Sequence, residues 1–177
     1  MKSRLIKFEV LFIVALVIAI IGYAAYDLLK APVIQKTKEN PTSAFSQPNQ
    51  LNDSIVEFGM TFLNTPYVAG GCSKDGFDCS GFVYFVYRHF DIETPRSSAD
   101  FEHFGKEIPI ADIRKGDMVL FLSPTRSVIG HIGIVTTSEG KNSDFIHATS
   151  GREMKVVISN LATEGYKNRF VKAIRVI

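Results

Sequence analysis

The order of the expected elements predicts an α+β fold for the C-terminal part of the chain. Two helix-like segments come first, one from about Asp53 to Leu63 and one that begins near Cys79. Strand-like segments then follow with turn residues between them, which favours a sheet built separately from the helices over a parallel α/β sheet. The expected strands cover residues 117–122, 130–136, 144–149, 154–159 and 170–177.

The N-terminus predicts a membrane-targeting segment over residues 1–26. Lys2, Arg4 and Lys7 precede an uncharged apolar run from Val10 to Ala25. Such a run is either a retained transmembrane anchor, which its length favours, or a signal segment that is cleaved. Positive flanks stay in the cytoplasm, so the rest of the chain is expected outside it, in the cell envelope.

Residues 27–50 are expected to form a flexible tether. They are rich in polar side chains, and Pro32, Pro41 and Pro48 are expected to break any helix. The folded domain is therefore expected over residues 51–177, which is long enough to bury one core.

The charge pattern gives no reason to expect nucleic acid as a partner. The chain carries 20 Lys and Arg residues against 18 Asp and Glu residues. Apart from the basic N-terminus the two signs are balanced, and no block of like charge appears in the expected domain.

The first helix is expected to be capped by Asn52 or Asp53, because short polar side chains accept hydrogen bonds from first-turn N–H groups. The second helix is expected to begin near Cys79, which lies within the segment Gly76–Phe82. The N–H groups of a first helical turn favour an anion, so this thiol is predicted to ionise more readily and to act as a nucleophile. The alternative is a buried structural cysteine.

Two of the four histidines are candidate partners for that thiol. His89 and His103 are expected at the surface, whereas His131 and His147 each lie within an expected strand. Turn-forming residues 137–143 separate these strands, so they are expected to pair antiparallel and bring the two imidazoles together. One ring would then act as the base and the other would orient it. The alternative is two strand histidines with local hydrogen bonds.

The same residue types bind zinc, but their spacing is not typical of a zinc site. Cys72 and Cys79 are seven positions apart and the two strand histidines are sixteen apart, whereas structural zinc sites use close pairs. No metal or other cofactor is expected.

Six segments of the chain together resemble the successive signatures of the NlpC/P60 family of cell-wall cysteine peptidases. They occur in the family's order, over about residue 52 to the C-terminus, and are Asn64–Cys72, Gly76–Phe82, Pro95–Ser98, Lys115–Phe121, Gly130–Ile134 and Phe145–Ala148. The resemblance implies a papain-like fold in which N-terminal helices pack on an antiparallel sheet. It also implies cleavage of peptidoglycan stem peptides between D-glutamate and a diamino acid.

The resemblance implies a role for each matching residue. Cys79 matches the nucleophile, His131 the general base and His147 the polar residue that orients it. Tyr67 matches a tyrosine beside the active site that helps the oxyanion site, although a tyrosine next to Val68 is also a common core residue.

Asp78 and Ser80 match positions that contact the amino end of the substrate. Asp78 is also a favourable helix cap, and the two roles are compatible. Arg96 pairs with a substrate carboxylate on one interpretation and is simply exposed on the other.

Cys72 departs from the family pattern, because small or polar residues are usual at its position. A disulfide with Cys79 would block the nucleophile, and we expect Cys72 to be free and partly buried.

Other functions use the same residues. A CHAP-like amidase or an acyltransferase would share the Cys and His chemistry, and a catalytically inactive module would only bind the cell wall. The expected partners are peptidoglycan stem peptides and the membrane, the latter through the N-terminal segment.

Overall fold

The computed structural model describes Tyr23 and residues 48–177. The expected membrane segment over residues 1–26, apart from Tyr23, and most of the expected tether lie outside the described residues. Within the described part of the chain, no helix combines the length and the apolar character that crossing a membrane requires.

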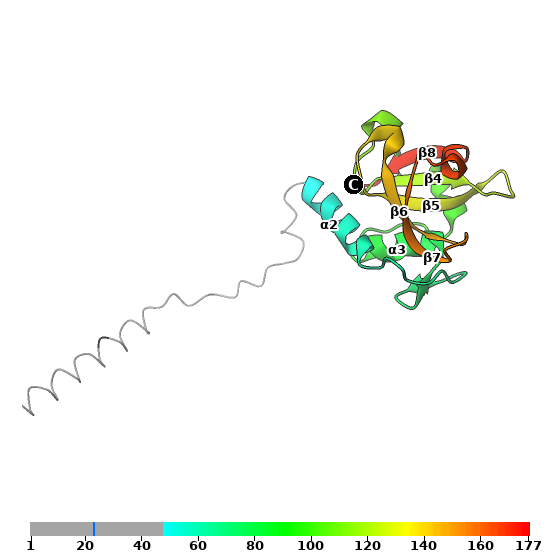
Figure 1. The fold of residues 1–177 in the computed structure, drawn as a ribbon. Helices are drawn as coiled ribbons and strands as arrows, with labels where there is room; N and C mark the ends of the chain where they lie inside the picture. The colour runs from blue at the N-terminus through cyan, green and yellow to red at the C-terminus, as the bar shows by residue number, and fades with distance from the viewer. Residues whose placement is uncertain (1–22, 24–47) are drawn as a thin grey trace, which may run out of the picture. The chain divides into compact units, whose positions relative to one another are not determined.

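Two helices precede a six-stranded antiparallel sheet (Figure 1). The helices are α2 (Pro48–Met60) and α3 (Cys79–Arg88), with a short hairpin of β1 (Cys72–Ser73) and β2 (Gly76–Phe77) between them. The sheet has the strand order β3-β8-β4-β5-β6-β7, and every neighbouring pair is antiparallel. Its strands are β3 (Lys106–Ile108), β4 (Met118–Leu122), β5 (Ile129–Val135), β6 (Asp144–Thr149), β7 (Lys155–Asn160) and β8 (Phe170–Arg175). The predicted α+β fold with an antiparallel sheet is confirmed.

Short helical segments connect the strands. They are the 3-10 helices η2 (Ser98–His103), η3 (Ile110–Asp112) and η4 (Gly140–Asn142), and the single-turn helix α4 (Glu164–Lys167) between β7 and β8. The five predicted strands correspond to β4–β8 with small differences at their ends. The edge strand β3 and the β1–β2 hairpin were not predicted, because two or three residues carry no alternation to recognise.

The prediction for the first helix was wrong at both ends. The helix begins at Pro48, five residues earlier than expected, and ends at Met60. Proline is tolerated in a first turn, because the N–H groups there have no partner within the helix. Asn52 and Asp53 therefore lie inside α2 and do not cap it, and the last three residues of the expected tether are helical.

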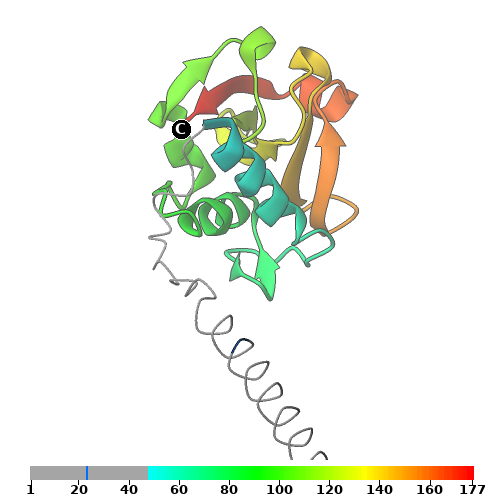
Figure 2. The same ribbon diagram turned by 90° about the vertical axis from the view of Figure 1, so that its left-hand side faces the viewer.

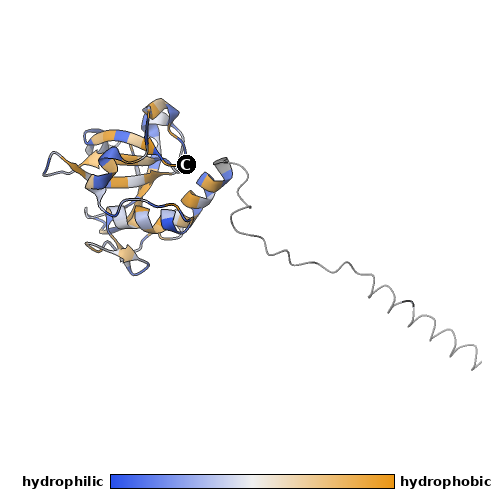
Figure 3. Ribbon diagram, turned by 180° about the vertical axis from the view of Figure 1, so that it is seen from behind, coloured by the Kyte–Doolittle hydropathy of each residue, from blue (hydrophilic) through white to orange (hydrophobic). Residues whose placement is uncertain are grey.

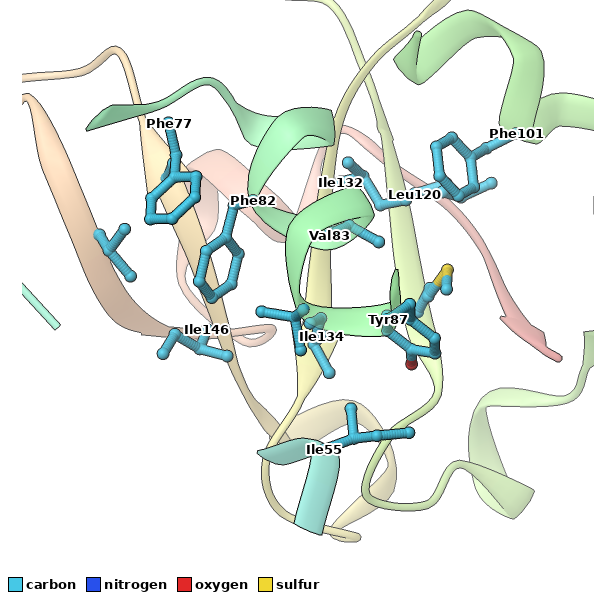
Figure 4. Packing of buried hydrophobic residues seen from close by; sticks show 14 of the residues in the cluster. Ile55, Phe77, Phe82, Val83, Tyr87, Phe101, Leu120, Ile132, Ile134 and Ile146 are labelled. Carbon is cyan, nitrogen blue, oxygen red and sulfur yellow. The ribbon is translucent and has the colours of Figure 1, made fainter. Parts of the chain in front are cut away.

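Helices α2 and α3 pack together against one face of the sheet, and Figure 2 shows α2 in front of the sheet and next to α3. Ile55 from α2 and Phe82 from α3 share one core with Ile132 and Ile146 from the strands (Figure 4). A second buried cluster, which includes Phe121 and Phe145, contains the residues that point to the opposite side of the strands. Both faces of the sheet are therefore covered.

Alternation along single strands explains the two clusters. In β4, Met118 and Leu120 belong to the first cluster, while Val119 and Phe121 belong to the second. Successive side chains of a strand point to opposite faces, so a continuous apolar run fills both layers. Figure 3 shows that α2, in contrast, has both apolar and polar positions, as expected for a helix with one exposed side.

Candidate active site

Cys79 is the first residue of α3, and Asp78 caps this helix as predicted. The Asp78 backbone is extended, and its Oδ1 atom accepts a hydrogen bond of 2.6 Å from the Gly81 N–H. The Cys79 thiol lies against β5, where Sγ is 3.9 Å from the carbonyl oxygen of Gly130. Since Gly130 directly precedes His131, the start of α3 meets the sheet beside that histidine.

His131 and His147 are in direct contact, as the sequence predicted. The Nε2 atom of His131 is 2.9 Å from Nδ1 of His147, and the two rings are perpendicular. They come from neighbouring antiparallel strands, because β5 pairs with β6. The hydrogen bond uses Nε2 of His131, so the other ring nitrogen, Nδ1, remains for a second partner. That nitrogen lies nearer to its own backbone, and thus to the β5 strand against which the thiol packs.

Gly133 makes room for this pair on β5. A Cβ atom at this position would lie 2.5 Å from Cδ2 of Phe145 and 3.1 Å from Cβ of His147. The first distance is shorter than any real contact of a Cβ atom, so a larger residue would force Phe145 and His147 to shift. The glycine two residues after His131 is therefore part of how the site is built.

The second nitrogen of His147 also has partners. Its Nε2 atom is 3.0 Å from the Ser159 hydroxyl on β7 and 3.3 Å from the Tyr166 hydroxyl on α4. The Tyr166 ring also stacks alongside His131, with the centroids 6.1 Å apart. Sequence reasoning identified neither residue. Finding Ser159 requires the β6–β7 register, and Tyr166 belongs to a helix of one turn.

Burial keeps both imidazoles neutral. It lowers the pKa of His131 from 6.5 to about 4, and the positive charge of Arg169 contributes in the same direction. The pKa of His147 is also lowered well below 6.5, first by burial and then by His131 and Arg169. Each ring is therefore uncharged at neutral pH and has one nitrogen without a hydrogen.

The expectation that Cys79 ionises more readily was wrong. Burial raises the pKa of this thiol above its ordinary value of 9.0, and the negative charge of Asp78 raises it further. Backbone N–H groups of Ser80, Cys79 and Ile132 act in the opposite direction, as expected at a helix start, but they do not outweigh burial. The resting state is a neutral thiol beside a neutral imidazole.

Arg96 holds the loop before the nucleophile in place. Its guanidinium donates to both carboxylate oxygens of Asp78, at 3.0 and 2.8 Å, and to the Ser80 hydroxyl at 3.2 Å. It also donates to the backbone carbonyl of Gly70 at 2.7 Å. Although the side chain is 38% exposed, these contacts show that Arg96 is more than the simple surface residue of the second interpretation. The sequence offered one signal for this role: Arg96 is a positively charged residue within one of the six family segments, and the negatively charged Asp78 lies within another.

Tyr67 lies close enough to Cys79 and Asp78 for their charges to affect its pKa. Burial raises the pKa of its phenol, and the neighbouring Cys79 and Asp78 raise it further, while a hydrogen bond with Ser150 lowers it. The phenol is therefore a protonated donor near the thiol. Both Tyr67 and Cys79 also pack against the first core cluster as partly buried residues.

Cys72 is free, as expected, but it is exposed and not partly buried as predicted. It lies in the short β1 strand, whose burial pattern is exposed at both positions. Cys79 is also a free thiol, so no disulfide blocks it. Across the described residues, no three His, Cys, Asp or Glu side chains come together as metal ligands would.

Helices packed on an antiparallel sheet, with a cysteine at a helix start beside a strand histidine, place the chain in the papain-like class. Within that class, the model of the NlpC/P60 family matches residues 64–175, and the chain belongs to this family. Its crystallised relatives include an NlpC/P60 family protein from Bacillus cereus, with a TM-score of 0.63 and 30% sequence identity. That match covers 70% of this chain and 39% of the other.

Two curated relatives are each 36% identical to this chain over the aligned residues. One is the gamma-D-glutamyl-L-lysine dipeptidyl-peptidase of Bacillus subtilis, matched over 50% of this chain and 30% of the relative. The other is the murein DD-endopeptidase MepS/murein LD-carboxypeptidase of Escherichia coli, matched over 63% of this chain and 55% of the relative. The chain thus spans about a third to a half of the length of these relatives.

Proposed function

We propose that this protein is a peptidoglycan hydrolase, a cysteine endopeptidase that cleaves stem peptides. The observation that carries the proposal is the position of the Cys79 thiol, beside the strand residue that precedes His131, together with the bond between His131 and His147. The names of both curated relatives describe peptidases, and one of them names murein.

In the first half of the proposed reaction, His131 removes the thiol proton as the sulfur attacks. The Cys79 S–H proton moves to Nδ1 of His131, and Sγ forms a bond to the amide carbon of the substrate. The resulting imidazolium keeps its Nε2–H bond to His147, which orients it. When the tetrahedral intermediate collapses, the imidazolium gives its proton to the departing amine and a thioester remains on Cys79.

In the second half, water replaces the amine. His131 Nδ1 takes a proton from the water as its oxygen attacks the thioester carbon, and a second tetrahedral intermediate forms. The carbon–sulfur bond then breaks, the carboxyl product leaves, and the imidazolium returns the proton to Cys79. Because the thiol and His131 are both neutral at rest, the attack of Cys79 requires proton transfer in the same step, and the attack of neutral water on the thioester requires it too.

Tyr67, Asp78 and Ser80 are assigned to substrate binding. The Tyr67 phenol and the Cys79 backbone N–H are donors of the kind that stabilise the oxyanion. Asp78 keeps 15% of its side chain exposed, which supports contact with the amino end of the substrate. Its charge is already shared with Arg96, and the buried Ser80 contributes through its hydrogen bond to Asp78.

The proposed scissile bond joins D-glutamate to the diamino acid of the stem peptide. The name of the Bacillus subtilis relative contains this linkage, which supports the assignment. The Escherichia coli relative carries the name of a DD-endopeptidase and matches a larger share of this chain. Opening of D-alanyl cross-links is therefore the second candidate. The proposed location is the cell envelope, attached to the membrane through residues 1–26 or exported after their cleavage.

Mass spectrometry of muropeptides incubated with the protein tests the proposal. We expect products that end in D-glutamate and products that begin with the diamino acid, with more than a 100-fold loss of rate in Cys79→Ala and His131→Ala. Cys72→Ala is the matched control, because it removes the exposed thiol and should retain activity. Unchanged turnover by Cys79→Ala would exclude the mechanism.

The same spectra separate the other functions. Cleavage of D-alanyl cross-links would identify a DD-endopeptidase, and release of whole stem peptides from the glycan would identify a CHAP-like amidase. New amide bonds to an added amine would indicate an acyltransferase. Binding to the wall without any new amine or carboxyl ends would leave only a binding module.

A further inference from the structure

Two hydroxyl groups converge on the outer nitrogen of the histidine pair. The Nε2 atom of His147 is 3.0 Å from the Ser159 Oγ and 3.3 Å from the Tyr166 hydroxyl. His147 itself is fully buried, so the position of its single proton depends on these contacts and on the contact with His131. Neither hydroxyl belongs to the proposed nucleophile, base or orienting residue.

The pair has two possible tautomeric arrangements. In the first, His131 donates from Nε2 to Nδ1 of His147, which then carries its own proton on Nε2 and leaves Nδ1 of His131 bare. In the second, His147 donates from Nδ1, and Nδ1 of His131 carries the proton. Only the first arrangement gives His131 a basic nitrogen on the side of β5 where Cys79 lies.

The two oxygen atoms favour the first arrangement. A single N–H group can be shared between two acceptor oxygens, as in three-centre hydrogen bonds. A bare ring nitrogen has one lone pair in the ring plane and accepts one good hydrogen bond. The second oxygen would then place its own lone pairs against that nitrogen. Two hydroxyls around Nε2 therefore suit a nitrogen that carries hydrogen.

We propose that Ser159 and Tyr166 are positioning residues that hold His147 as its Nε2–H tautomer and thereby leave Nδ1 of His131 free to take the Cys79 proton. The tautomer of His147 is a property of the resting protein. The consequence for proton transfer from Cys79 rests on the proposed function. Packing keeps Tyr166 in place, because its ring contacts Phe121 and Phe145. Arg169 lies over the outer side of that ring, 5.4 Å from its centre.

Nitrogen NMR of the full-length chain reads the tautomer without any substrate. The protein has only four histidines, so selective ¹⁵N labelling of histidine gives assignable signals. We expect His147 of the wild type to show a protonated Nε2 and a bare Nδ1 at neutral pH. In the double variant Ser159→Ala/Tyr166→Phe, which keeps the aromatic ring, the opposite tautomer should become populated.

Kinetics give the second measurement. We expect kcat/KM to fall about tenfold in Ser159→Ala and on the order of 100-fold in the double variant, the range found when the partner that orients a metal-binding histidine is removed. Ser159→Thr keeps the hydroxyl and should restore both the tautomer and the rate. Ser143→Ala is the matched control. It removes a hydroxyl just before β6 that accepts a hydrogen bond from the Glu139 N–H and not from the histidine pair.

The outcomes separate this inference from the proposed function. If His147 carries its proton on Nδ1 in the wild type, or if the double variant leaves the tautomer unchanged, the positioning role is wrong even in an active hydrolase. If the tautomer responds as expected but the wild type cleaves no muropeptide, the positioning role stands and the proposed function fails. Equal losses in Ser159→Ala and Ser159→Thr with an unchanged tautomer would indicate packing alone.

Discussion

Replacing His131 by glutamine should remove a large part of the acid sensitivity of folding. Burial lowers the pKa of His131 from 6.5 to about 4. The unfolded chain therefore binds more protons than the folded protein between these pH values, and stability falls as the pH falls through this range. At about 1.36 kcal/mol for each pKa unit, the full effect is about 3.4 kcal/mol, of which about 2.5 kcal/mol is lost between about pH 7 and pH 4.5.

Urea unfolding at a series of pH values measures this difference. We expect the free energy of unfolding of the wild type to fall by about 2.5 kcal/mol more than that of His131→Gln between about pH 7 and pH 4.5. His103→Gln is the matched control, because it removes an exposed imidazole from η2. Parallel curves for wild type and His131→Gln would refute the buried neutral state assigned to His131. If the free energy of unfolding of the His103 variant depended less on pH than that of the wild type, His103 would contribute to the acid sensitivity.

Two further predictions concern the packing and the charge around the site. Gly133→Ala should lower the free energy of unfolding by about 1–3 kcal/mol, because a methyl group there collides with Phe145 and His147. Urea unfolding measures this change. Gly165→Ala, with no atom within 4 Å of its added Cβ, should change it by less than about 0.5 kcal/mol, and equal effects would contradict the packing argument. Asp78→Asn should lower the pKa of the Cys79 thiol, because it removes a negative charge while an amide oxygen can still cap α3. The pH dependence of thiol alkylation in a Cys72→Ala background measures this, and a midpoint that stays or rises would show that Asp78 does not raise the thiol pKa.

The sequence predicts the elements of this site well where one residue pattern decides the outcome. Strand alternation around His131 and His147, with turn residues between them, was sufficient to place the two rings in contact. Asp78 was recognised as a cap because capping depends on a few adjacent residues. Local patterns of this kind need no knowledge of the rest of the fold.

Properties that depend on distant segments could not be predicted in the same way. A helix start predicts a more acidic thiol, but the burial that reverses the pKa shift comes from the packing of the whole domain on Cys79. Arg96 reaches Asp78 across 18 positions of sequence, and Tyr166 reaches His147 across 19. The start of α2 was missed because Pro48 was interpreted as a helix breaker, whereas its effect depends on where in the helix it lies.

The contacts of Arg96, Ser159 and Tyr166 are important because the Cys79 thiol and His131 are both neutral at rest. A thiol with a raised pKa is rarely a thiolate at neutral pH, so the proposed attack depends on immediate proton transfer and not on a stored anion. Proton transfer of this kind depends on the geometry and protonation of the acceptor nitrogen. Arg96 holds the loop that precedes Cys79, while Ser159 and Tyr166 contact the nitrogen of His147 that faces away from His131. The rate should therefore respond more to changes in these supporting residues than it would in an enzyme whose thiolate forms before the substrate binds.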